Sequence, residues 1–285
     1  MSTVYLNGEF LPMHEARISP MDRGFLFGDG IYEVIPSYGG RTVGLGPHLT
    51  RLQQGLQAIG MVLPDVEWTH LIEQLLDQNG RGNLGVYLHV SRGTDTRRFH
   101  AYPDPKSVPA TIFAFTFDIP AEPVADISLC KKYRVALSED QRWRRCHIKS
   151  TALLGNVMHF QEGYSAGLDE TILHNSDGCI TEASACNVFV VKEGVVYTPP
   201  LDHQLLPGIT RQILLDILRN YSEIEALEQM ITLEQLNDAD EVWLTSSSKE
   251  LAPVIEIAGK PVANGEVGPL WLQAQRLFSQ YKYQY

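Results

Sequence analysis

The sequence lacks several features that would assign it to a common class of protein. Its 285 residues contain no run near the ~20 apolar residues that span a bilayer. The first residues, MSTVYLNGEF, lack the basic and apolar segments of a secretory signal. The four cysteines form no CxxC pair and no ligand spacing with histidine, so we expect neither a disulfide framework nor a metal site. These absences predict a cytoplasmic protein with reduced thiols.

Positive charge is also scarce. The chain has 23 Lys and Arg against 34 Asp and Glu, a formal net charge of −11. Such a chain is repelled by phosphate backbones and anionic membranes, so we expect neither nucleic acid nor membrane as a partner. With 44% hydrophobic residues the composition is globular, and the length allows one large domain or two ordinary ones.

Strand-like and helix-like segments alternate along the chain. Asn-Gly in VYLNGEFLP and Gly-Gly in IYEVIPSYGGRTVGL each predict a hairpin. Helices are predicted over about 47–61, 66–78, 151–165, 208–220 and 267–282, and strands over about 84–93, 111–119, 127–137, 170–174, 186–192 and 195–198. The two prolines of IPAEPV make 119–124 the best linker. We therefore predict an α+β fold of two domains, 1–118 and 125–285.

One lysine stands apart from the others. Of the eight lysines, most lie in turns, loops or the tail, which leaves Lys149 and Lys249. Lys149, in RWRRCHIKSTALLGN, precedes Ser150 and Thr151, either of which could cap the helix that follows. Partial desolvation there would lower the pKa of the amine and make it nucleophilic. A lysine that extends from a strand end into solvent is the plainer interpretation of this feature alone.

Two loops have the chemistry of an anion site. Gly208, in LLPGITRQILLDILRN, opens a predicted helix, and Thr210 offers a hydroxyl in its first turn. Free N–H groups and the helix dipole favour an anion at such an end. The second loop, TSSSKE at 245–250, follows the probable buried strand EVWL. Ordinary capping and turn chemistry would explain either loop by itself.

A carboxylate lies between a strand-like run and a chain of small residues. Glu182, in GCITEASACNVFVV, is followed by Ala and Ser before Asn187. Small side chains let a planar group approach the backbone, and the carboxylate could hold a protonated ring nitrogen. A solvated glutamate at a strand end is the plainer alternative.

In this order and spacing, DRGFLFGDGIYEV, IKSTALLGN, ILHNSDGCITEASACNVFVV and LLPGITR resemble the class IV aminotransferases that use pyridoxal 5′-phosphate (PLP). The resemblance covers nearly the whole chain. It implies PLP fold type IV: a small N-terminal α/β domain, a larger C-terminal β-barrel-like α/β domain, the cofactor in the cleft between them, and usually a homodimer.

The resemblance also implies roles for individual residues. Lys149 would carry the PLP Schiff base, and Glu182 would pair with the pyridinium nitrogen. The expected phosphate ligands are Arg51, the amides of Ile209 and Thr210, and a hydroxyl of Ser246 or Ser247. PLP withdraws electrons from the substrate Cα while its ring nitrogen stays protonated, and the released lysine amine can move the proton.

The stretch SRGTDTRRFHAYP, 91–103, resembles the Arg-x-His loop of D-amino acid aminotransferases. In that family the loop comes from the neighbouring subunit and binds the substrate α-carboxylate. The matching residues are Arg98 and His100, and Tyr32 would complete the site; Arg97 could serve in place of Arg98. A guanidinium makes paired, charge-assisted bonds to a carboxylate.

The sequence therefore predicts a transaminase that moves an amino group between a D-amino acid, such as D-alanine, and 2-oxoglutarate or pyruvate. It departs from the D-amino acid pattern by an extra residue before Arg98, and by Ala185 and Cys186 where serines are usual. Three enzymes that share the lysine, glutamate and phosphate site stay open: 4-amino-4-deoxychorismate lyase, (R)-amine transaminase and, less favoured by YLHVSRG, branched-chain L-aminotransferase. A non-catalytic interaction protein on the same fold is the alternative from another class.

Overall fold

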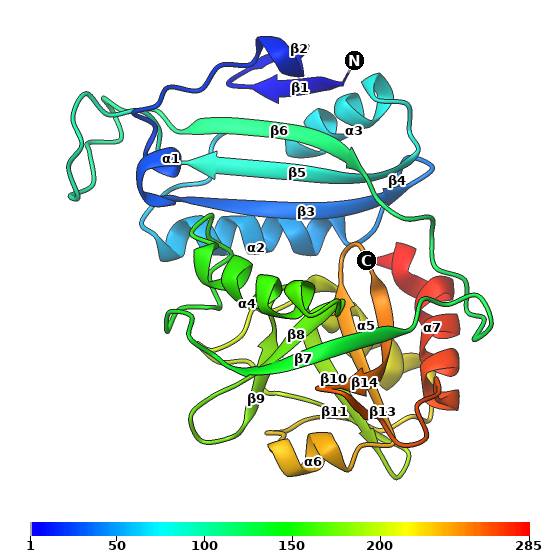
Figure 1. The fold of residues 1–285 in the computed structure, drawn as a ribbon. Coiled ribbons are helices and arrows are strands. Elements are labelled where there is room, and N and C mark those ends of the chain that lie inside the picture. The colour runs from blue at the N-terminus through cyan, green and yellow to red at the C-terminus, as the bar shows by residue number, and fades with distance from the viewer. Residues whose placement is uncertain (1) are drawn as a thin grey trace. The chain divides into compact units, whose positions relative to one another are not determined.

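The computed structural model describes residues 2–285, which divide into two compact units. One unit comprises the residues up to Glu122 together with Ile148–Leu153 and Tyr285, and the other comprises Pro123–His147 and Leu154–Gln284. The segment that carries Lys149 thus packs with the first unit, although the residues before and after it belong to the second (Figure 1).

The first unit is built on an antiparallel sheet of six strands in the order β2-β1-β6-β5-β3-β4. Its strands are β1 (Thr3–Leu6), β2 (Glu9–Pro12), β3 (Gly30–Tyr38), β4 (Arg41–Thr42), β5 (Asn83–Ser91) and β6 (Thr111–Asp118), and its helices are α1 (Arg23–Phe27), α2 (Leu45–Ala58) and α3 (Trp68–Gln78). Asn7 and Gly8 have φ of 50° and 106°, and Gly39 and Gly40 have 58° and 82°. These left-handed pairs suit two-residue hairpin turns, and both predicted hairpins are confirmed.

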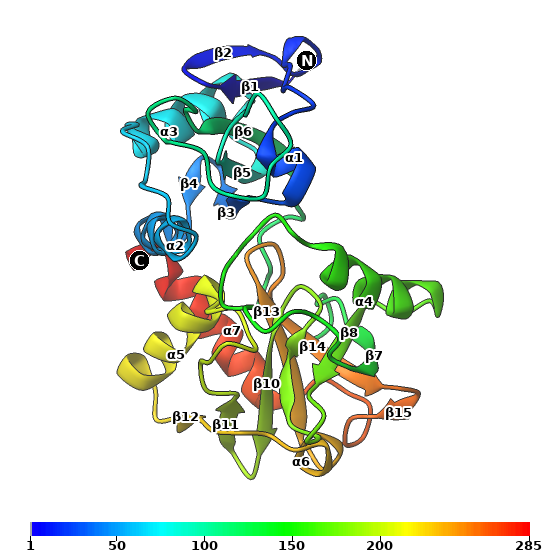
Figure 2. The same ribbon diagram turned by 90° about the vertical axis from the view of Figure 1, so that its left-hand side faces the viewer.

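The two faces of this sheet differ. Side chains alternate along β3, so Ile31 and Ile35 lie in a core that α2 and α3 cover (Figure 2). The other face carries half-buried aromatic rings. Tyr32 and Tyr87 stack with their centroids 5.6 Å apart, and Phe115 lies 5.0 Å from Tyr87.

The second unit holds a mixed sheet of nine strands in the order β12-β11-β10-β13-β14-β7-β8-β9, with β15 paired to β14. The strands are β7 (Tyr133–Glu139), β8 (Glu170–His174), β9 (Ile180–Ala183), β10 (Asn187–Lys192), β11 (Val195–Thr198), β12 (Ala226–Glu228), β13 (Glu241–Ser246), β14 (Glu250–Ile257) and β15 (Lys260–Pro261). The helices are α4 (Leu154–Ser165), α5 (Ile209–Tyr221), α6 (Leu233–Asn237) and α7 (Pro269–Tyr281). Within residues 2–285, no helix combines the length and apolar character needed to cross a membrane.

Two predicted elements begin three or more residues later than expected. The helix predicted over 151–165 begins at Leu154, so neither Ser150 nor Thr151 caps it. The strand predicted over 127–137 begins at Tyr133, because Asp126 starts a turn in which its carboxylate accepts from Ser128 N at 2.8 Å. The short helices α1 and α6 were not predicted, since five residues hardly exceed one helical turn.

Candidate active site

Lys149 lies in an extended segment that pairs with the start of β3. The amide of Tyr32 donates to the Lys149 carbonyl at 3.1 Å, and the amide of Thr151 donates to the Gly30 carbonyl at 3.0 Å. The Lys149 side chain is half-buried, and its Nζ lies 4.1 Å from the centroid of the Tyr32 ring. Backbone pairing, not a helix cap, therefore fixes the amine over the tyrosine.

Glu33, next to Tyr32 on β3, is fully buried in an ion pair. Arg51 Nε and Nη2 donate to its two carboxylate oxygens at 2.8 and 2.7 Å, and His48 Nδ1 lies 2.7 Å from Oε2. Burial by itself would raise the pKa of Glu33, but Arg51 and His48 lower it to about 2. Burial lowers the pKa of His48, so its ring is neutral at pH 7. Glu33 and Arg51 form a balanced, permanently charged pair.

Neither Glu33 nor His48 was predicted as a site residue, yet the sequence contained a signal for both. Alternation along β3 places Glu33 on the same face as Ile31 and Ile35, where a carboxylate needs a partner. His48 and Arg51 are three residues apart and share one face of α2. When polar residues occupy core positions on two elements that pack together, they can be predicted to bind each other.

Glu182 lies on β9 and is 5% exposed. Arg142 Nη1 donates to its Oε1 at 2.6 Å, while the Leu206 amide and Asn187 Nδ2 donate to Oε2 at 3.1 and 3.3 Å. Burial raises the pKa of Glu182 to about 7, although Arg142 acts in the opposite direction. Glu182 is therefore poised to titrate, and the solvated alternative is wrong.

Arg142 is shared between two carboxylates. Its Nε and Nη2 donate to Asp140 at 3.0 and 2.7 Å, which leaves one bond for Glu182. One cation between two buried carboxylates leaves an excess negative charge whenever Glu182 is ionised. A protonated ring nitrogen would supply the missing positive charge, so this cluster fits the pyridinium of PLP. Arg142 and Asp140 had no sequence signal, because they lie outside the predicted elements.

The start of α5 has room for an anion. Gly208 is the N-cap residue, and no side chain of residues 2–285 caps the helix. The first N–H groups, those of Ile209 and Thr210 included, are left to an external acceptor. A Cβ at Gly208 would lie 1.9 Å from Asn187 Oδ1, so only glycine fits this approach. Asn187 also donates to Glu182, and it thereby joins the helix start to the Glu182 cluster.

The predicted loop TSSSKE, 245–250, begins next to Asn187. Thr245 pairs with Asn187 between β13 and β10, Ser246 ends β13, and Ser247 begins the turn to β14. The Thr245 hydroxyl is buried without a hydrogen-bond partner among residues 2–285, while the Ser246 hydroxyl lies beside the Cys186 thiol. An unpaired buried hydroxyl beside a helix N-terminus fits a phosphate group.

Cys186 replaces a serine that the D-amino acid pattern usually has at this point. Its Sγ lies 3.6 Å from Glu170 Oε2, and the side chain is buried. Burial raises the pKa of Cys186 to about 12, so the group stays a neutral thiol. The replacement removes a hydroxyl without adding a nucleophile.

Arg98 and His100 are exposed and lie together around one ring. The Arg98 guanidinium is 5.1 Å from the centroid of Phe27, and the His100 ring is 5.3 Å from it. Arg97 instead covers Phe99 at 4.4 Å. Within residues 2–285, no hydrogen bond, ion pair or ring contact joins Arg98 or His100 to Tyr32.

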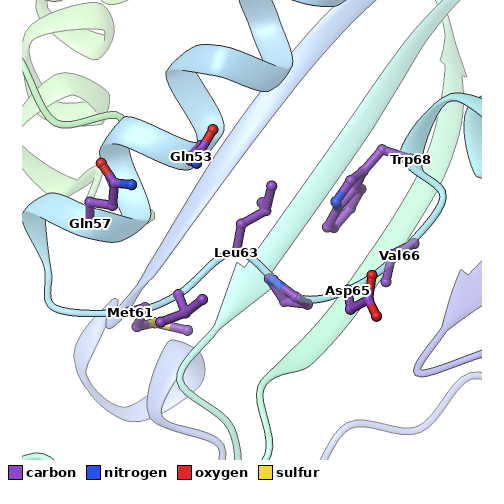
Figure 3. Close-up of a pocket in the computed structure, with 9 residues that line it drawn as sticks. Gln53, Gln57, Met61, Leu63, Asp65, Val66 and Trp68 are labelled. Atoms are coloured by element: carbon purple, nitrogen blue, oxygen red, sulfur yellow. The ribbon is translucent and has the colours of Figure 1, made fainter.

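A cavity of ≈ 390 Å³ lies apart from these residues, between α2 and the start of α3 (Figure 3). It is lined by Gln53, Gln57, Met61, Val62, Leu63, Pro64, Asp65, Val66 and Trp68. The lining includes no lysine and none of the predicted site residues, so the cavity is no candidate for transamination. Among residues 2–285, no group of three His, Cys, Asp or Glu is arranged to hold a metal ion.

Comparison with known proteins identifies the family. The model of the class IV amino-transferases matches residues 30–257. A D-alanine aminotransferase of Staphylococcus haemolyticus is 37% identical over 286 residues, which cover 99% of this chain and 98% of the relative. A D-alanine aminotransferase of Listeria monocytogenes is 34% identical and covers 96% of this chain and 94% of its own length.

Solved structures agree on the fold. The branched-chain aminotransferase of Thermoproteus uzoniensis matches with a TM-score of 0.86 at 25% identity, over 99% of this chain and 95% of that one. The Escherichia coli branched-chain enzyme, at 22% identity and a TM-score of 0.88 over 99% and 94%, has the same fold. These matches confirm the predicted fold type IV. The chain belongs to the class IV aminotransferases.

Proposed function

We propose that this chain is a PLP-dependent transaminase that moves an amino group between a D-amino acid, such as D-alanine, and 2-oxoglutarate or pyruvate. The observation that carries the proposal is the Lys149 amine fixed over Tyr32, in a chain 37% identical to a D-alanine aminotransferase over 99% of its length. The excess negative charge around Glu182 supports the same cofactor.

PLP, when bound, withdraws electrons from the substrate Cα and makes its proton acidic. In the proposal Lys149 holds the cofactor covalently, and its amine, once released, moves the proton at Cα. Glu182 keeps the ring nitrogen protonated, and Arg142 holds Glu182 in place. The proposed phosphate ligands are Arg51, oriented by Glu33, the amides of Ile209 and Thr210, and the hydroxyl of Ser246 or Ser247.

Arg98, His100 and Tyr32 are the proposed ligands of the substrate carboxylate. We propose that the chain forms a homodimer in which the Arg98 and His100 loop serves the partner's site. Exposed apolar side chains on α4, each between 57% and 73% exposed, support a protein interface: Leu154, Val157, Met158 and Tyr164.

Mixing two defective variants tests this arrangement. An Arg98→Ala chain, which binds D-alanine weakly, and a Lys149→Ala chain, which is inactive, are refolded together. They form heterodimers with one intact site if the loop acts across the interface. The low KM of the parent protein should then return, with the sedimentation coefficient of a dimer. A mixture that keeps the high KM of Arg98→Ala while dimers form would assign the loop to its own chain's site.

The domain division and the location are further proposals. The change of unit between Glu122 and Pro123 supports a linker at 119–124 between domains 1–118 and 125–285. Limited proteolysis that cuts first at 119–124 would agree with it. A cytoplasmic location is proposed from the sequence composition, and cell fractionation tests it.

A panel of amino donors tests the reaction itself. With 2-oxoglutarate or pyruvate as acceptor, D-alanine should be consumed and L-alanine should not. Turnover of L-leucine or L-valine would indicate a branched-chain enzyme, and turnover of an (R)-amine without a carboxylate would indicate an amine transaminase. Release of pyruvate from 4-amino-4-deoxychorismate would indicate the lyase. A protein that retains no PLP absorbance after excess PLP is removed would be non-catalytic.

A further inference from the structure

The loop between β5 and β6 carries Arg98 and His100, and it has almost no regular structure. Both side chains are exposed, yet carboxylate binding requires them in a defined place. We propose that Arg23 of α1 is the positioning residue that holds this loop in its binding conformation. The inference rests on the proposed function, because it assigns Arg23 a role through Arg98 and His100.

The two ends of the loop are tied to the residue before Arg23. Asp22 is 2% exposed and accepts from the Ser91 hydroxyl at 2.7 Å and from the Thr111 hydroxyl at 2.6 Å. Ser91 ends β5 and Thr111 begins β6, so one carboxylate clamps the points where the loop leaves and rejoins the sheet. The Arg23 amide adds a bond to the Gly93 carbonyl at 2.9 Å.

The Arg23 side chain reaches the part of the loop that carries the function. Its Nη1 donates to the Phe99 carbonyl at 2.6 Å and its Nη2 to the His100 carbonyl at 3.4 Å. Arg23 is 3% exposed, although the residues it holds are exposed. A buried guanidinium that binds two successive carbonyls fixes the backbone on both sides of His100.

The Arg23 guanidinium is also bound to a carboxylate through its Nε. Arg23 Nε donates to Asp29 Oδ2 at 2.8 Å, and Arg92 Nε and Nη2 donate to the same carboxylate at 2.8 and 3.0 Å. Arg92 also covers the ring of Tyr102, further along the loop, at 3.6 Å. One carboxylate thus binds two guanidiniums that each contact the loop.

The ring of Phe27 completes the support. The guanidinium carbons of Arg23 and Arg98 lie 4.8 and 5.1 Å from its centroid, and the His100 ring lies at 5.3 Å. Segment 22–29 therefore contacts the loop ends, the loop backbone and both binding side chains. An arginine that only stabilised α1 would not need its two bonds to the Phe99 and His100 carbonyls.

A double-mutant cycle on the PLP-loaded protein tests the inference. Arg23→Met should raise KM for D-alanine about tenfold and leave kcat within about threefold. In an Arg98→Ala, His100→Ala background the same change should raise KM less than about twofold, since its effect passes through these two side chains. Arg23→Lys keeps the charge but cannot reach three acceptors, so it should not restore KM.

Arg17→Met is the matched control. Arg17 is exposed and donates to the His14 and Ala16 carbonyls at 2.6 and 2.9 Å, so it makes the same type of bond away from the loop. The KM of the Arg17→Met variant for D-alanine should stay at the parent value. In the PLP-free protein, hydrogen exchange of residues 93–109 should accelerate in Arg23→Met and stay unchanged in Arg17→Met.

The possible results separate the role of Arg23 from the proposed function. If Arg98→Ala raises KM but Arg23→Met does not, or if the effect of Arg23→Met multiplies with that of Arg98→Ala, His100→Ala, the role of Arg23 is overturned and the proposed function stands. If Arg98→Ala leaves KM unchanged, the carboxylate assignment and the inference from it both fail. Should Arg23→Met not fold, Phe27→Leu takes its place in the cycle with the same expectations.

Discussion

Glu33 and Glu182 are both buried, and each accepts hydrogen bonds from an arginine. They differ in the number of hydrogen bonds that the arginine donates to each. Glu33 takes two bonds from Arg51 and a third from His48, and its pKa falls to about 2. Glu182 takes one bond from Arg142, which gives two to Asp140, and burial raises the pKa of Glu182 to about 7. Equal burial thus yields a fixed charge in one case and a titratable group in the other.

The difference shows what each glutamate is suited to do. A permanently paired carboxylate orients its arginine and exchanges no proton near pH 7. A carboxylate that lacks its full counter-charge favours an external cation, such as a protonated ring nitrogen. Substitutions at Glu33, Glu182 and Lys149 should therefore have different effects.

The largest effect on turnover is expected from the replacement of Lys149. Lys149→Ala should lower D-alanine turnover by at least about 10⁴-fold, because it removes both the covalent link and the group that moves the proton. Circular dichroism should stay unchanged. Lys131→Ala is the control, since Lys131 is exposed and contacts Asp169 and the Tyr133 ring, away from the predicted site residues. Retained turnover in Lys149→Ala would refute the assignment.

The same substitution should destabilise the protein to different extents at the two glutamates. Glu33→Gln leaves Arg51 without its anion and should destabilise the PLP-free protein by about 3–5 kcal/mol. Glu182→Gln should cost less than about 1 kcal/mol at pH 8, because Arg142 keeps Asp140 and an unbalanced charge is removed. Urea unfolding of both variants measures this. Equal losses would mean that the two sites do not differ in charge balance.

The pH dependence of stability should sharpen the contrast. The pKa of Glu182 is higher in the folded protein than its ordinary value of 4.5, so the folded state holds the proton more tightly. The protonated Glu182 therefore adds to the free energy of unfolding. This contribution is complete below pH 4.5 and is lost as pH rises towards 7, a loss of about 3 kcal/mol. Between pH 5 and 8, PLP-free wild type should therefore lose stability relative to Glu182→Gln. Parallel curves would contradict the raised pKa.

The smallest of these effects concerns substrate binding alone. Arg98→Ala should raise KM for D-alanine about 10²-fold, the loss of a charge-assisted pair of bonds, and leave PLP affinity unchanged. A titration of PLP absorbance beside steady-state kinetics separates the two quantities. An unchanged KM would move the carboxylate role to Arg97 or elsewhere.

Sequence reasoning found the parts of the site that local patterns encode. Asn-Gly and Gly-Gly turns predicted the hairpins, and the Gly208 signal predicted the start of α5. Lys149 was identified, but its support was not. Ser150 and Thr151 were expected to cap a helix, whereas the segment pairs with β3, and no local pattern encodes a pairing between residues more than a hundred positions apart.

The ion pairs were missed for the same reason. Arg142 and Glu182 are 40 positions apart, and Arg142 lies outside any regular element, so no periodicity marks it. Glu33 and Arg51 are 18 apart and could have been matched from their core-facing positions on β3 and α2. Whether a buried carboxylate titrates depends on how an arginine divides its bonds, and that is a property of the folded chain.

The measurement that tests the account most directly is borohydride reduction of the PLP-loaded protein, followed by peptide mapping. Reduction fixes the cofactor to whichever amine holds it. We expect one phosphopyridoxyl group per chain, on the peptide that contains Lys149. A label on Lys249 or another lysine, or no label at all, would contradict it.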